Sequence, residues 1–106
     1  MELLCILLRK EGYIEDVLTV LTATGIHDAI VLNATNMRQI IAHDIPIFAG
    51  FKRELGAGAD YCRLVIASIP SDDTIGDMLN LLKKSGLDFS DPLLGSIHVI
   101  PCRKIV

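Results

Sequence analysis

The segment VLTVLTATGI (residues 17–26) has a counterpart near the other end of the chain, MLNLLKKSGL (residues 78–87). Both segments carry apolar residues at the same positions, and both close with a glycine followed by an apolar residue. Apolar residues at this spacing form one face of a helix, and a glycine just past the last turn is typical of a helix end. The repeat therefore indicates two similar halves, each containing one amphipathic helix.

Each predicted helix lies between two short apolar segments that are typical of strands. The element order is strand–helix–strand in each half, with an insertion at about residues 36–61 between the halves. Two such halves predict a single α+β domain over residues 1–106, a ferredoxin-like βαβ-βαβ sandwich with four antiparallel strands and both helices on one face. The predicted strands are residues 3–8, 29–32, 63–69 and 96–102.

The ends of the second helix carry their own signals. Ser71 is the predicted N-cap, Asp72 and Asp73 are expected in the first turn, and Lys83 and Lys84 in the last. These charges oppose the helix dipole at both ends. In the final strand, Pro101 cannot donate a backbone hydrogen bond, which predicts an edge position for the later part of that strand.

The first strand, LLCILL (residues 3–8), is apolar on both faces. A sheet that is covered on one face should alternate apolar and polar residues, because one face meets water. Two helices cover only one face, so the other needs a second copy of the chain. At about 25 cal/mol per Å² of buried apolar area, such a face is a strong driver of association. We therefore expect a homo-oligomer with its sheets facing inward.

Composition narrows the function classes. Of the 106 residues, 51% are hydrophobic and 22% charged, and the net charge is −3 with the basic residues dispersed. Nucleic-acid binding is therefore not expected. The apolar runs are shorter than the ~20 residues of a membrane span, and the start lacks a basic signal-peptide region. We expect a cytoplasmic protein without membrane insertion, whose cysteines (Cys5, Cys62 and Cys102) are reduced.

The insertion contains IAHDIPIFAGFKRELGAGADY (residues 41–61). We expect it to be ordered and largely helical, with Pro46 in a first helical turn and Asp44 as a cap. An apolar stripe of Phe48, Phe51 and Leu55 then packs on the protein's own oligomer or docks on a partner protein. The glycines of GAGAD provide a hinge back to the third strand.

Three segments together resemble the P-II nitrogen-regulatory family. They are the opening MELLCILLRKEGYIEDVLTVLTATGI, the MRQ at residues 37–39, which is similar to the base of the family's T-loop, and the ending GSIHVIPCRKIV. The resemblance implies a homotrimer that binds adenine nucleotides (ATP, ADP or AMP), and often 2-oxoglutarate, between subunits. It also implies a T-loop that docks on a target such as a transporter or an enzyme. A member of this family is a regulator of nitrogen utilisation and not an enzyme.

Carried onto this chain, the resemblance implies ligand contacts at Arg38, Gln39, Gly95 and Ser96. Ser96 stands where the family has a phosphate-binding lysine, and GLDFSDPLLGSIHV (residues 86–99) lacks most of the glycines of the family's phosphate loop. A serine provides no point charge for a phosphate. No metal or catalytic residue is predicted.

Three alternatives stay open beside this interpretation. The first is a metal-responsive trimer of the same sandwich, similar to the CutA divalent-ion tolerance proteins and using Cys and His. The second is an interaction module without a small ligand. The third is an acylphosphatase-type enzyme, for which Arg9 follows the first strand. It is disfavoured because the carboxylates in RKEGYIED would repel a phosphate.

Overall fold

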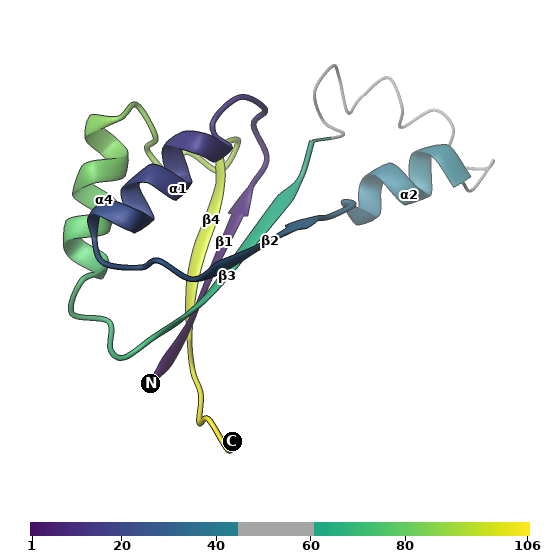
Figure 1. Ribbon diagram of the computed structural model, residues 1–106. Coiled ribbons are helices and arrows are strands. Elements are labelled where there is room, and N and C mark those ends of the chain that lie inside the picture. Colours follow the sequence, from purple (N-terminus) through teal and green to yellow (C-terminus); the bar gives the residue numbers. More distant parts are fainter. Residues whose placement is uncertain (45–60) are drawn as a thin grey trace.

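The computed structural model describes residues 1–44 and 61–106, and it confirms the predicted α+β architecture (Figure 1). Four strands form one sheet, and two helices lie together on one side of it. A further helix, α2, follows β2 and extends away from the sheet (Figure 1). The elements are β1 (Glu2–Leu8), α1 (Ile14–Ala23), β2 (Ala29–Asn33), α2 (Met37–Asp44), β3 (Arg63–Ile69), α4 (Ile75–Lys84) and β4 (Gly95–Pro101).

The strand order in the sheet is β2-β3-β1-β4, and every neighbouring pair is antiparallel. This is the arrangement predicted for two βαβ halves. β1 is central, with β3 on one side and β4 on the other, so the doubly apolar segment lies in the middle of the sheet. β4 forms an edge, which confirms the position expected from Pro101.

The covered face of the sheet, meaning the face under α1 and α4, carries the core. The even-numbered residues of β1 point to it, and their register partners on β3 point the same way. From the other side, α1 contributes Val17 and Leu21, and α4 contributes Met78 and Leu82. These helix positions repeat in the two halves, as the sequence comparison predicted. The fully buried strand residues are Leu4, Ile6, Leu8 and Val65.

Among the described elements, no helix lies over the opposite face, which we call the open face (Figure 1). Its residues are the odd-numbered positions of β1 and their neighbours across the sheet. Exposure of large side chains rises toward the edges, where Ile30 is 61% and Ile100 is 48% exposed. The apolar residues of the open face are Leu3, Cys5, Leu7, Ile30, Leu32, Leu64, Ile66 and Ile100.

The start of α4 differs from the prediction. The helix begins at Ile75 with Thr74 as N-cap, so Ser71 is not the cap and Asp77 is the acidic residue of the first turn. Asp72 and Asp73 instead form a preceding turn, in which the Ile75 amide donates to the Asp72 carbonyl at 3.1 Å. The helix therefore starts later than predicted, because Ser and Asp favour turns as strongly as helix caps, and here these residues form a turn. The lysines of the last turn are confirmed.

Candidate functional site

One end of the sheet gathers the segments that carry the predicted ligand contacts. Asn33 at the end of β2 pairs with Arg63 at the start of β3, and Arg63 pairs in turn with Leu8. Leu8 also pairs with Gly95 at the start of β4. These four residues form a row across the sheet, and both α2 and the loop before β4 join the sheet at this row. The antiparallel topology therefore directs all of the candidate residues to the same end.

Arg38 and Gln39 lie in the first turn of α2. Asn36 precedes the helix, and its side-chain Oδ1 accepts a hydrogen bond from the Arg38 amide at 2.9 Å. An asparagine in this position satisfies one of the free amides of a helix start. The sequence analysis expected helix only from residue 41 onward, and Asn36 was the signal that would have placed the start correctly.

The insertion is described only at its two ends. Residues 41–44 of the predicted helical segment belong to α2. The apolar stripe of Phe48, Phe51 and Leu55 lies outside the described residues, as does Pro46. The expected packing or docking of that stripe therefore stays a prediction.

Gln39 has an unusual environment. Its Oε1 atom is buried, and within the part of the chain that the structure describes it accepts no hydrogen bond. A buried amide oxygen without a donor costs about 1–3 kcal/mol. Among the four predicted contacts, Gln39 is therefore the one with a buried polar atom that has no donor within residues 1–44 and 61–106.

Gly95 has a structural role that the sequence analysis did not assign. Its φ is +147°, a conformation that side-chain-bearing residues rarely adopt, and a Cβ at this position would clash with the carbonyl of Leu7. The absence of a side chain is what lets the start of β4 approach β1 closely. This geometry explains the glycine without a ligand.

Ser96 follows on the open face, directly opposite Leu7. Its hydroxyl lies 3.1 Å from Nε2 of His98, two residues further along the same strand. Ser96 is half-buried and His98 is exposed. The serine is therefore engaged by a neighbour in its own strand.

The four predicted contacts share one end of the sheet but stand at opposite edges of it. β2 leads to Arg38 and Gln39, whereas β4 begins with Gly95 and Ser96, and two strands separate β2 from β4. With strands 4.7–4.9 Å apart, the two edges are roughly 14 Å apart. α2 also extends away from β4 (Figure 1). A small ligand therefore does not reach both pairs within one copy of the chain.

The loop before β4 is organised by its own carboxylates. Asp88 Oδ1 accepts from the Ser90 amide at 3.0 Å and from the Ser90 hydroxyl at 2.6 Å, and Asp91 Oδ1 accepts from the Leu93 amide at 3.0 Å. The hydrogen bonds from Ser90 lower the pKa of Asp88 below its usual 3.8, so this carboxylate is ionised at neutral pH.

These hydrogen bonds decide whether the loop fits a nucleotide phosphate. The amides of Ser90 and Leu93 already donate to carboxylates, and the two carboxylates would repel a polyphosphate. Ser96 adds no charge. The residues of this loop therefore do not fit the phosphates of ATP. The missing lysine already indicated a poor fit for phosphate in the sequence. The sequence did not reveal that the backbone amides of the loop already donate hydrogen bonds to the carboxylates.

Two cations near this end of the sheet lie over aromatic rings. The Lys10 ammonium is 5.4 Å from the centre of the Tyr13 ring, and the Arg63 guanidinium is 4.9 Å from the centre of the Tyr61 ring. Each pair holds a cation against an aromatic face. The sequence analysis singled out none of these residues for a site. The Arg63 pair is the more relevant to the candidate site, because Arg63 belongs to the row of paired residues at the end of the sheet where the predicted ligand contacts lie.

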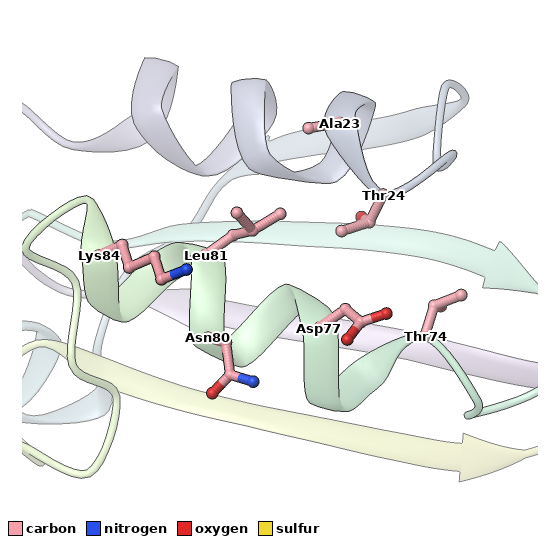
Figure 2. A pocket seen from close by; sticks show the side chains of 7 residues that line it. All are labelled: Ala23, Thr24, Thr74, Asp77, Asn80, Leu81 and Lys84. Carbon is pink, nitrogen blue, oxygen red and sulfur yellow. The ribbon is translucent and has the colours of Figure 1, made fainter.

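Among the surface hollows on the helix side of the molecule, two border polar residues of the helices or of the loop before β4. One, of about 490 Å³, opens between the end of α1 and α4, where Figure 2 shows Thr24 and Asp77 from opposite helices. Its lining includes the exposed polar side chains of Asp77, Asn80 and Lys84 on α4. The second, of about 280 Å³, lies beside the carboxylate-bearing loop and includes Lys10, Tyr13, Asp88 and Asp91. Neither coincides with the predicted ligand contacts.

Comparison with known proteins identifies the fold. No protein-family model matches the sequence, and no curated protein matches it. Among solved structures, the chain is similar to CPII from Thiomonas intermedia K12 bound to ADP, AMP and acetate, with 16% identity and a TM-score of 0.59 over 93% of this chain and 82% of that chain.

Two further structures of CPII give the same result. The apo form, described as a nitrogen regulatory PII-like protein, has a TM-score of 0.57 at 16% identity over 92% of this chain and 84% of that chain. The form bound to ADP, AMP and bicarbonate has a TM-score of 0.57 at 16% identity, covering 98% of this chain and 94% of that chain. The chain therefore has a PII-like fold.

The structure also bears on membrane association. Across residues 1–44 and 61–106, no helix is both long enough and apolar enough to span a bilayer.

Proposed function

We propose that this protein is a PII-like regulatory protein and not an enzyme. It assembles as a trimer through the open face of its sheet and binds a small anionic ligand between subunits. It acts by contact with a target protein such as a transporter or an enzyme. The observation that carries the proposal is the fold, which matches PII-like structures over nearly the whole chain at TM-scores of 0.56–0.59.

The open face supports assembly. It presents apolar side chains on all four strands, with Ile30, Leu32 and Ile100 exposed in a single copy, beside the polar residues Ser68, Ser96 and His98. Burying such a surface against water is favourable by about 25 cal/mol per Å². A neighbouring copy with the same surface is the simplest cover that the chain provides.

Assembly also supplies a place for the ligand. Arg38 and Ser96 belong to opposite edges of one sheet, so they meet only where the β2 edge of one copy lies beside the β4 edge of another. In this arrangement Arg38 provides the charge for an anion, and Gln39 Oε1 receives the donor that it lacks within the described residues. The ligand site then exists only between subunits.

The ligand class follows from the charges around this cleft. Asp88 and Asp91 lie in the loop that leads into Gly95 and Ser96, and they repel a ligand with several phosphates. We therefore propose a ligand with few negative charges, with AMP preferred to ATP among adenine nucleotides. Two structures of CPII contain both ADP and AMP, one of them together with acetate and the other with bicarbonate.

A second candidate function is a metal-responsive trimer similar to the CutA proteins. It is favoured by one observation, the position of Cys5 directly opposite His98 on the open face. The chemistry of this pair is developed below.

A ligand panel tests the proposal. Calorimetric and thermal-shift titrations with ATP, ADP, AMP and 2-oxoglutarate should show a selective shift, because a ligand that binds only the folded protein stabilises it by mass action. Light scattering of the same samples should show a trimer. A stable monomer whose unfolding temperature is unchanged by all four compounds would overturn the proposal.

A further inference from the structure

The open face contains one pair of metal-binding side chains that the proposed ligand site does not use. Cys5 on β1 and His98 on β4 are register partners, so they stand side by side on neighbouring strands. Both point away from the helices, because the alternate residues of β1 form the covered core. Cys5 is a free, half-buried thiol, and His98 is exposed.

The spacing of this pair suits a shared metal ion. Directly opposite residues in an antiparallel sheet have Cβ atoms about 4.5–5.5 Å apart. Zinc binds a thiolate at about 2.3 Å and an imidazole nitrogen at about 2.0–2.1 Å, so both side chains reach one ion from this separation. Nε2 of His98 lies 3.1 Å from the Ser96 hydroxyl, which leaves Nδ1 as the ligand nitrogen. A hydrogen bond of this kind orients a metal-binding histidine.

The surroundings favour a soft or borderline ion over a hard one. Cys5 has His98 on one side and Ile66 on the other, and the neighbouring positions of β1 on this face are Leu3 and Leu7. A thiolate with an imidazole selects zinc or copper, whereas magnesium and calcium need oxygen ligands. The side chains directly beside Cys5 on β1 and β3 are apolar, and the Ser96 hydroxyl is the oxygen that lies next to His98.

The described residues of one copy supply only part of a coordination shell. Within the described ranges, no group of three or more His, Cys, Asp or Glu side chains is arranged to hold a metal ion. Structural zinc sites have four ligands. The shell is therefore incomplete among residues 1–44 and 61–106, and a neighbouring copy on the open face is where the proposed assembly provides further ligands.

We propose that Cys5 and His98 form one part of an intersubunit Zn²⁺ site on the open face, completed by a neighbouring copy of the chain. The inference rests on the proposed assembly through this face. The ion joins subunits across an otherwise apolar contact, and Ser96 positions the imidazole. Because the ion is shared, each chain binds at most one ion, and a dissociated chain binds it weakly.

Cobalt substitution of the reduced, full-length protein tests this site. A cobalt–thiolate bond gives a charge-transfer absorption, which should appear with the wild-type protein and disappear in Cys5→Ser and in Cys5→Ala. His98→Gln should weaken Zn²⁺ binding at least about tenfold in competition with a chromophoric chelator, since even the loss of an outer-shell partner costs 10–100-fold. Ser96→Ala, which keeps both ligands, should weaken binding by roughly tenfold. Magnesium should not compete.

Two matched controls separate this site from general binding by Cys and His. Cys102→Ser removes an exposed thiol beyond the end of β4, and His27→Gln removes an exposed imidazole between α1 and β2. Both should retain the absorption and the affinity for Zn²⁺. Thermal unfolding of each metal-free variant checks that it is folded before its binding is compared.

Light scattering with Zn²⁺ and with a chelator distinguishes the two proposals. A trimer that persists in chelator but shows no Cys5-dependent absorption would overturn the zinc site and leave the assembly intact. Equal loss in Cys102→Ser would also overturn it. A monomer under both conditions would remove the assembly and the site together. Binding that depends on Cys5 and His98, at no more than one ion per chain in an assembled species, supports the site.

Discussion

The two faces of the sheet are built from the same kinds of residue but have different surroundings. On the covered face, Ile6 is fully buried under the helices. On the open face, Ile66 from the adjacent strand lies opposite Cys5 and is only half-buried in a single copy. The chain buries one face with its own helices, whereas the other face is buried only in the assembly that we propose. The comparison implies a test. Substitutions on the covered face should lower the stability of the fold equally at every protein concentration, whereas substitutions on the open face should lower it by weakening the assembly, and so in a concentration-dependent way.

The largest expected effect concerns the same substitution on the two faces. Ile6→Ala should lower the free energy of unfolding by about 2–5 kcal/mol, because it leaves a cavity in the core. This loss should not depend on protein concentration. Ile66→Ala should instead weaken the trimer and make the unfolding midpoint more dependent on concentration. Denaturant unfolding at several protein concentrations measures both. Equal, concentration-independent losses would show that the open face has no partner.

The second effect links ligand binding to the open face. Arg38→Ala should weaken binding of the anionic ligand by about 1.5–3 kcal/mol, the range for a hydrogen bond to a charged group. Calorimetry with AMP measures this loss, and Lys83→Ala on the exposed side of α4 is the charge-matched control. Ile66→Asp, which should dissociate the trimer, should remove binding as well. AMP binding to a dissociated variant would place the site within one subunit.

The third effect concerns the start of β4, where Gly95 lies against β1. Gly95→Ala should lower the free energy of unfolding by about 1–3 kcal/mol, because the added Cβ meets the Leu7 carbonyl and φ is unfavourable. Gly76→Ala is the matched control. A Cβ at Gly76 meets no atom within 4 Å, so this change should be neutral or should stabilise the helix by up to about 1 kcal/mol. Thermal unfolding of both variants ranks them, and a harmless Gly95→Ala would contradict the close approach of β4 to β1.

The smallest effect is a pH dependence on the helix side. The pKa of Asp88 is below 3.8 in the folded protein because Ser90 donates two hydrogen bonds to its carboxylate. Its contribution to stability is therefore present above pH 3.8 and is lost as the pH falls through the folded pKa. Asp88→Asn should flatten the acid limb of the stability profile slightly and leave the trimer unchanged. An identical acid limb in the variant would assign the pH dependence to other carboxylates.

The sequence predicted the fold well because the relevant signals were local and repeated. The apolar positions of residues 17–26 and 78–87 located both helices, and Pro101 located the edge strand. The start of α4 was misplaced because Ser71, Asp72 and Asp73 favour a turn as readily as a helix start. The start of α2 was missed because its signal was the single residue Asn36.

The candidate site could be predicted from the sequence less well than the fold. Arg38 and Ser96 are assigned to one site by resemblance, but their separation at opposite edges follows only from the strand order. The hydrogen bonds within the loop before β4, which Asp88 and Asp91 accept, depend on the folded geometry of that loop and could not be predicted from the sequence. The pairing of Cys5 with His98 depends on register between the first and last strands, and no local pattern specifies that register.

The central position of β1 affects how the chain is made. In the native sheet Glu2 pairs with Pro101, so β1 acquires one of its neighbours only after all the other helices and strands described here have been translated. Until then the segment LLCILL keeps the edge that faces β4 unpaired, although β3 and both covering helices have already been made. Contacts this distant along the chain slow folding, and unpaired apolar strands aggregate. Newly made chains should therefore depend on chaperones that bind short apolar segments, and slowing synthesis between β1 and β3 should increase that dependence.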